Sequence, residues 1–163
     1  NRFSEDIDVY IERNLDTLKL FYDSLQKKGF VIEKKKIGEN SIYSTLRFNR
    51  TSVRFEALFK KKQGILADYE KAEGNFITVS VLSPEELVKE KVETYLNRLK
   101  IRDLYDIFSL LKYIQDINSV KKDLNNLFSD FKEPIDPKAL RALITEGITP
   151  NAEEMLGYIR RRL

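Results

Sequence analysis

The first half of the chain alternates apolar and polar residues with the two-residue period of β-strands. In residues 6–12, Asp-Ile-Asp-Val-Tyr-Ile-Glu, the apolar side chains share one face and both aspartates lie on the other. A helical stretch follows, beginning at Asn14 or Asp16 and ending near Gly29. Similar alternation predicts further strands over residues 30–37, 42–48, 53–59 and 76–81, with a hairpin connection at 49–51.

The pattern changes at Ser83-Pro-Glu-Glu86, where serine can cap a helix that proline opens. From there the periodicity is helical, which predicts helices over residues 84–98, 101–115, 117–129, 137–145 and 151–162. We therefore predict an α+β protein, with a small mixed β-sheet core over residues 1–82 and a helical region over residues 83–163. Because the chain leads almost directly into a strand, we expect the N-terminal part of the sheet domain to be missing.

Composition narrows the chemistry that this protein can perform. The 163 residues include no cysteine and no histidine, which excludes thiolate sites, histidine general bases and nearly all zinc sites. A metal ion would need oxygen ligands, so Mg²⁺ or Mn²⁺ is the expected cofactor. The net charge of +3 is only weakly indicative of a nucleic-acid partner. No apolar run could span a bilayer and no signal-peptide pattern is present, so we expect a cytoplasmic protein without a membrane partner.

Three carboxylates are candidates for that metal site. Asp6 and Asp8 lie two residues apart on one strand, so their side chains project from the same face, ~7 Å apart. Glu56 faces away from the apolar side of the strand over residues 53–59 and could supply a third carboxylate. Together they could hold one or two divalent ions that bridge nucleotide phosphates. The alternative interpretation is that Asp-x-Asp is only the solvent face of an edge strand.

The first two predicted C-terminal helices carry unusual charges. Lys91 lies at the border of the apolar stripe of helix 84–98, with Arg98 beside the stripe. Helix 101–115 is apolar on most sides, apart from a narrow strip that includes Arg102, Asp103 and Asp106. Charges on a helix buried on several sides are costly unless they are paired or used. These charges could serve a functional site, or Arg102 and Asp106 could form a purely structural ion pair, and the sequence leaves both interpretations open.

Two separated motifs carry a resemblance to a known family. The segment Arg2-Phe-Ser-Glu-Asp-Ile-Asp8 is similar to an Arg-x-Ser-x-Asp-Ile-Asp strand. Lys91, then Arg98, then Arg102-Asp-Leu-Tyr-Asp106 is similar to a Lys…Arg…Arg-Asp-x-Tyr-Asp block. Both motifs resemble those of the AbiEii/AbiGii toxin family, which includes the MenT toxins, within the nucleotidyltransferase superfamily.

The resemblance implies roles for individual residues. Asp6 and Asp8 would hold the metal, Ser4 would lie close to the nucleotide phosphates, and Lys91 would contact the triphosphate. Arg98 and Arg102 would also bind the nucleotide, and Asp103 would complete the site from the helical side. The family moves a nucleoside monophosphate from a nucleoside triphosphate to an acceptor, which is tRNA for some members, and a toxin of this kind has a cognate antitoxin partner. Glu56 is assigned from its strand position and matches no family motif.

One departure from the family leaves alternatives open. The Gly-Gly-Thr/Ser turn that cradles phosphates ahead of the first strand is absent from this sequence. Either the turn lies upstream, or the protein is a catalytically inactive binding module with a nucleotidyltransferase fold. A metal-dependent nuclease is a weaker alternative, because Lys60 follows Glu56 by four residues rather than the expected two.

Overall fold

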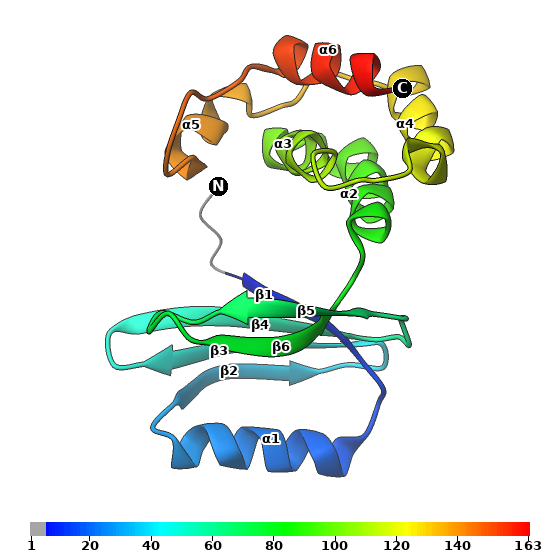
Figure 1. Ribbon diagram of the computed structural model, residues 1–163. Helices are drawn as coiled ribbons and strands as arrows, with labels where there is room; N and C mark the ends of the chain where they lie inside the picture. Colours follow the sequence, from blue (N-terminus) through cyan, green and yellow to red (C-terminus); the bar gives the residue numbers. More distant parts are fainter. Residues whose placement is uncertain (1–5) are drawn as a thin grey trace. The chain divides into compact units, whose positions relative to one another are not determined.

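The computed structural model describes residues 6–163, which form six strands in two sheets together with six α-helices. This confirms the predicted α+β class. The chain divides into two compact units, residues 4–63 and residues 64–163 (Figure 1). Ser4, a predicted phosphate neighbour, lies outside the described residues.

The first unit is a four-stranded mixed sheet with a helix along one face. Its elements are β1 (Asp6–Ile11), α1 (Leu15–Lys27), β2 (Val31–Ile37), β3 (Ser41–Phe48) and β4 (Thr51–Phe59). The strand order is β1-β4-β3-β2; β1 runs parallel to β4 and the other neighbouring pairs are antiparallel. The crossover through α1 therefore carries the chain from β1 to the far edge, and the β3–β4 hairpin returns it to the side of β1.

The apolar alternation along these strands builds the core beneath α1. Leu18 and Tyr22 on α1 are buried against Ile42, Leu46 and Ala57 of the sheet. The Tyr22 hydroxyl also lies 3.1 Å from the hydroxyl of Ser44, which is fully buried on the same face. Pairing these two hydroxyls removes the cost of burying each one alone. The opposite face of the sheet is left for polar side chains.

A second, two-stranded sheet opens the other unit and corrects our expectation of a single sheet. The hairpin of β5 (Ile65–Glu70) and β6 (Phe76–Val81) pairs Ile65 with Val81 and Glu70 with Phe76. We predicted β6 but no strand at β5. Several apolar side chains of this hairpin are exposed: Ile65, Leu66, Tyr69, Phe76 and Ile77.

The rest of the second unit is helical. Its α-helices are α2 (Pro84–Arg98), α3 (Ile101–Leu110), α4 (Lys121–Ser129), α5 (Leu140–Leu143) and α6 (Ala152–Arg162). The predicted helix over residues 101–115 therefore ends early, at Leu110. The predicted helices over residues 117–129 and 137–145 each begin with a short 3₁₀ helix, at Ile117–Val120 and Pro137–Ala139. No helix within residues 6–163 is long and apolar enough to cross a membrane.

The helices enclose a core separate from that of the sheet, in which α2, α3, α4 and α6 all bury apolar side chains. Tyr95 of α2 lies at its centre, and its hydroxyl donates to the carbonyl of Lys132 at 2.7 Å. Burial of the Tyr95 hydroxyl raises its pKa above the usual tyrosine value, and the nearby carboxylates Glu133 and Asp136 add to the shift. The segment after α4 is thus tied to α2.

Candidate active site

The acidic residues of the first unit share the sheet face opposite α1. In the parallel pairing of β1 with β4, Asp8 lies beside Glu56 and Asp6 lies beside Arg54. Partners in a parallel pair project to the same side, and neighbouring strands are about 4.8 Å apart. The expectation that Asp6, Asp8 and Glu56 stand on adjacent strands and face the same side is therefore confirmed. Their role as metal ligands stays a prediction.

Asp6 is the most enclosed of the three carboxylates. Its side chain is 23% exposed, and Arg54 Nε lies 2.5 Å from its Oδ1 atom. That oxygen is buried, yet it accepts no hydrogen bond of good geometry from any described residue. Arg54 and Asp6 therefore form an ion pair, but the N–H groups of Arg54 are not aligned for a hydrogen bond to this oxygen. Burying this oxygen is costly unless a cation stands beside it, and here the Arg54 guanidinium is that cation.

Asp8 and Glu56 are exposed beside it. Across β4, Glu56 is the register partner of Tyr43 on β3, which is half-buried. Within residues 6–163, no three acidic side chains come close enough to form a complete metal cage by themselves. Mg²⁺ usually takes only one or two carboxylates and completes its shell with substrate phosphates and water. The two carboxylates of Asp6 and Asp8 are consistent with a Mg²⁺ site of this kind.

In the second unit, Asp103 forms the centre of a charge network between α2 and α3. Its side chain is fully buried, and both of its oxygens accept from Arg98, at 2.7 Å from Nε and 2.7 Å from the second guanidinium nitrogen. Such a two-point ion pair fixes the guanidinium in orientation as well as in place. Arg98 itself is 42% exposed.

Lys91 joins this network from α2. Its ammonium lies 2.7 Å from Asp106 and 4.0 Å from Asp103. The ammonium is therefore held between two carboxylates of α3, and 28% of the side chain is exposed. Arg102 is half-buried on the same helix. The expectation that the polar strip is largely buried is confirmed. That one of its members lines the same cleft as the strand aspartates stays a prediction.

Two contacts were not expected from the sequence. The structure pairs Arg54, to which no role was assigned from the sequence, with Asp6. Asp136 accepts from the backbone N–H of Ile101 at 2.8 Å and so caps α3 from a distant part of the chain. The only signal for the second contact was the dipeptide Asp136-Pro137, which is typical of a helix start.

The chain was also compared with known proteins. A family model described as "Nucleotidyl transferase AbiEii toxin, Type IV TA system" matches residues 1–158. A comparison with curated proteins finds no match. The family match extends over both units and includes every residue predicted above to take part in the site.

Proposed function

Because this chain belongs to the AbiEii family of nucleotidyl transferase toxins of type IV toxin–antitoxin systems, we propose that it transfers a nucleoside monophosphate from a nucleoside triphosphate to an RNA acceptor such as tRNA. We propose further that the transfer depends on Mg²⁺ or Mn²⁺, and that a cognate antitoxin counteracts the protein in the cytoplasm. The observation that carries the metal-dependent mechanism is the pair Asp6 and Asp8 on one face of β1, beside Glu56 on β4.

Asp6 and Asp8 would hold the metal ion, which supplies charge neutralisation at the phosphates during transfer. Arg54 competes for Asp6, so its guanidinium would have to turn aside when the ion binds. Arg54 is 43% exposed, so its guanidinium could move toward water. Glu56 lies next to Asp8 on the neighbouring strand. From there its carboxylate would accept the proton of the attacking hydroxyl.

The cations of α2 and α3 would bind the triphosphate. Lys91 suits this role because Asp106 and Asp103 hold its compact charge in place before the ligand arrives. Arg98, which is 42% exposed, and Arg102 would add two further cations to the site. Asp103 has both oxygens engaged by Arg98. Its part in catalysis would therefore be to position these cations, not to ligate the metal.

The decisive experiment is nucleotidyl transfer itself. The protein is incubated with Mg²⁺, each radiolabelled nucleoside triphosphate in turn, and a total tRNA pool, and label is counted on RNA and on protein. Asp6→Asn should reduce transfer by at least about a hundredfold, since it removes a carboxylate that stabilises charge in the transition state. The matched control is Glu12→Gln, which removes the same charge from an exposed residue whose partner Lys61 is also exposed.

Two outcomes would count against the proposal. Equal transfer by Asp6→Asn and Glu12→Gln would show that Asp6 holds no catalytic metal. Nucleotide binding without any transfer would favour the inactive binding module, for which the Arg54–Asp6 ion pair is the supporting observation, because it already neutralises the key carboxylate.

A further inference from the structure

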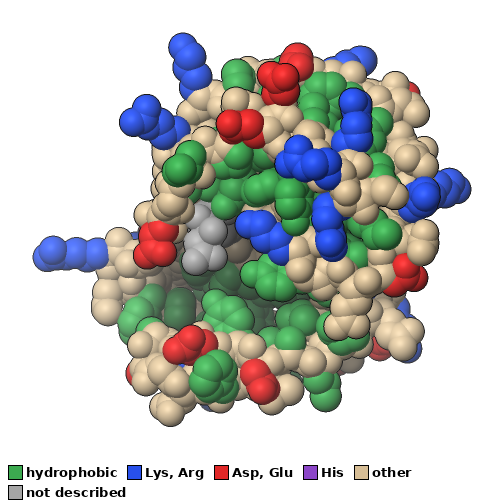
Figure 2. Space-filling model, turned by 45° about the horizontal axis from the view of Figure 1, so that its top comes forward, with side chains coloured by type: hydrophobic (Ala, Val, Ile, Leu, Met, Phe, Trp, Pro, Cys, Tyr) green, Lys and Arg blue, Asp and Glu red, His purple; other side chains and the backbone are tan. Residues whose placement is uncertain are grey.

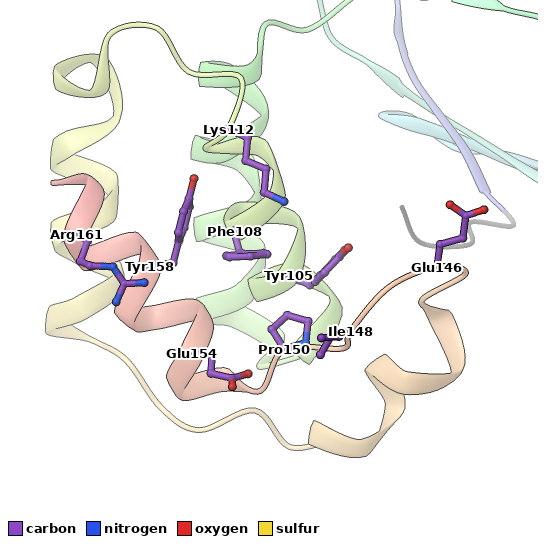
Figure 3. A pocket seen from close by; sticks show the side chains of 9 residues that line it. All are labelled: Tyr105, Phe108, Lys112, Glu146, Ile148, Pro150, Glu154, Tyr158 and Arg161. Carbon is purple, nitrogen blue, oxygen red and sulfur yellow. The ribbon is translucent and has the colours of Figure 1, made fainter.

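A groove on the helical unit lies well away in sequence from the strand carboxylates and has no part in the chemistry proposed above. It runs between α3 and α6 beside the segment 146–150 and has a volume of about 450 Å³ (Figure 3). Volumes of this size are typical of sites that take a small molecule or a single nucleotide. Tyr105, Phe108 and Tyr158 line it, together with the cations Lys112 and Arg161.

The aromatic lining is built from both helices. The ring of Phe108 lies 4.9 Å from that of Tyr158 in an edge-to-face arrangement, and 6.0 Å from that of Tyr105. These rings pack against the helical core and yet border an open groove. Arg162 ties the end of α6 to the turn that follows α3, because its guanidinium donates to the carbonyls of Leu111 and Ile114. The groove is therefore a preformed feature, which lowers the cost of binding a flat ring.

Two cations stand at this aromatic surface. The ammonium of Lys112 lies 5.0 Å from the centre of the Phe108 ring, and the side chain is exposed. Arg161 belongs to the run of arginines that ends α6, and its guanidinium lies along the bare backbone of Gly157. Figure 2 shows one face of the protein, on which basic side chains are interspersed with apolar ones. Aromatic rings interleaved with cations are the pattern by which proteins bind unpaired nucleotides.

The acidic residues of the groove do not cancel this pattern. Glu154 is committed to the start of α6, where it accepts from the backbone of Asn151 at 2.8 Å. Glu146 lies at the end of the groove opposite Arg161 (Figure 3). A carboxylate there is placed to accept from the amino group of a base. Lys112 and Arg161 stand on either side of the Phe108 and Tyr158 rings (Figure 3), so each could meet a phosphate of a strand whose base lies on those rings.

We propose that the groove between α3 and α6 binds an unpaired nucleotide of a polynucleotide strand, with the base against Phe108 and Tyr158 and the phosphates on either side of that base near Lys112 and Arg161. The inference rests on the proposed function only in identifying that strand as the RNA acceptor. An acidic peptide would use the two cations but would gain little from the aromatic rings. The rings therefore decide in favour of a nucleotide.

The test is binding of fluorescein-labelled single-stranded RNA, followed by fluorescence anisotropy in the absence of nucleoside triphosphate. Tyr158→Leu keeps an apolar side chain but removes the stacking ring, and it should raise the dissociation constant at least about fivefold. Tyr158→Phe keeps the ring and should bind as tightly as the parent protein. Lys112→Glu combined with Arg161→Glu should weaken binding at least tenfold and flatten its dependence on salt.

The control for charge is Lys121→Glu combined with Lys122→Glu, two exposed lysines on α4 that change the net charge by the same amount. This control should bind RNA within about twofold of the parent protein, and far-UV circular dichroism should show that all variants are folded. Single-stranded DNA of the same sequence, duplex RNA and free mononucleotides complete the series. If the DNA binds as tightly as the RNA, the groove is still a nucleotide-binding site, but the strand it binds is not specifically RNA.

Three results would overturn the inference: equal weakening by both charge reversals, unchanged binding by Tyr158→Leu, or displacement of the RNA by an acidic peptide at equal concentration. The outcome is separable from that of the proposed function. A protein that binds RNA in the groove but transfers no nucleotide disproves the proposed function alone. A protein whose groove variants bind RNA normally and still transfer nucleotide disproves this inference alone.

Discussion

Asp103 is the residue whose surroundings constrain its role most tightly. A carboxylate with no exposed surface needs a full set of partners, and Arg98 supplies two hydrogen bonds while Lys91 stands 4.0 Å away. The exposed fractions are unequal, since Arg98 is 42% exposed and Asp103 is 0% exposed. Removing the arginine would leave the buried carboxylate of Asp103 without its main partner. Removing the aspartate would leave a cation that can turn to water.

This asymmetry gives a prediction about stability. Arg98→Met keeps the alkyl stem but removes the guanidinium, and it should lower the free energy of unfolding by about 3 kcal/mol. Asp103→Asn should cost less, about 1–2 kcal/mol, because the neutral amide leaves no buried charge unpaired. The double variant should be less destabilised than the sum of the two single ones. Urea unfolding followed by circular dichroism measures all three, and a larger effect of Asp103→Asn than of Arg98→Met would contradict this account.

The face on which the candidate carboxylates lie followed from the sequence, but their partners did not. Alternation alone placed Asp6 and Asp8 on one side of their strand, because successive side chains of a strand point to opposite sides. The contact of Asp6 with Arg54 depends on the register between β1 and β4, two strands separated by some forty residues. Alternation within one strand carries no information about register with another. The pairing of Asp103 with Arg98 depends instead on how the chain turns between α2 and α3, where Leu99 adopts a left-handed conformation that the helical periodicity does not predict.

At the scale of elements, α3 depends on a residue far along the chain. Its own first residues provide no side-chain cap, and the N–H of Ile101 donates instead to Asp136, 35 residues later. Lys100 also lies 3.5 Å from the other oxygen of Asp136. The N–H of Ile135 donates to the carbonyl of Leu99, so the backbone is fixed on both sides of this cap. The α2–α3 junction that presents Lys91 and Arg98 is thereby joined to the segment after α4.

Asp136→Ala should therefore lower the free energy of unfolding by about 1 kcal/mol, the usual cost of losing a helix cap. Asp136→Asn should cost less, because its amide oxygen can still accept from Ile101. Asp130→Ala provides a matched control at an exposed position in the same segment. Thermal unfolding measures the difference. Equal effects of Asp136→Ala and Asp130→Ala would mean that the cap contributes nothing to stability.

Most elements could be predicted from periodicity, and the exceptions have physical reasons. Strands β3 and β4 and helices α2 and α6 each bury one face, and this produces a regular apolar pattern in the sequence. Strand β5 was missed because much of its apolar surface is exposed and because Ala, Asp and Glu are poor strand formers. The early end of α3 was missed because Leu111 and Ile114 lie in the turn after the helix and are still buried in the core. Their three-residue spacing resembles that of another helical turn.

For the molecule as a whole, the sequence indicated an α+β class and the family, but not the number of sheets. Two buried clusters share no residue, one beneath the four-stranded sheet and one among the helices. Each proposed set of ligand contacts is supported by its own cluster: the strand carboxylates by the first, and the lysine–arginine network by the second. A nucleotide bound as proposed would make stability depend on both metal and phosphate.

That dependence is the last prediction. Any ligand that binds only the folded protein stabilises it, by about 2.7 kcal/mol at a concentration one hundred times its dissociation constant. A nucleoside triphosphate with Mg²⁺ should therefore raise the melting temperature, and the same nucleotide with excess EDTA should raise it far less. Asp6→Asn should lose the part of the shift that depends on Mg²⁺, whereas Glu12→Gln should retain it, since Glu12 and its partner Lys61 are both largely exposed. Lys91→Met should lose the part that survives in EDTA, because that part comes from phosphate bound by cations alone.

A melting temperature that rises equally with and without Mg²⁺ in the parent protein would remove the reason for placing a metal on Asp6 and Asp8. The cations of α2 and α3 would then make up the whole of the nucleotide site.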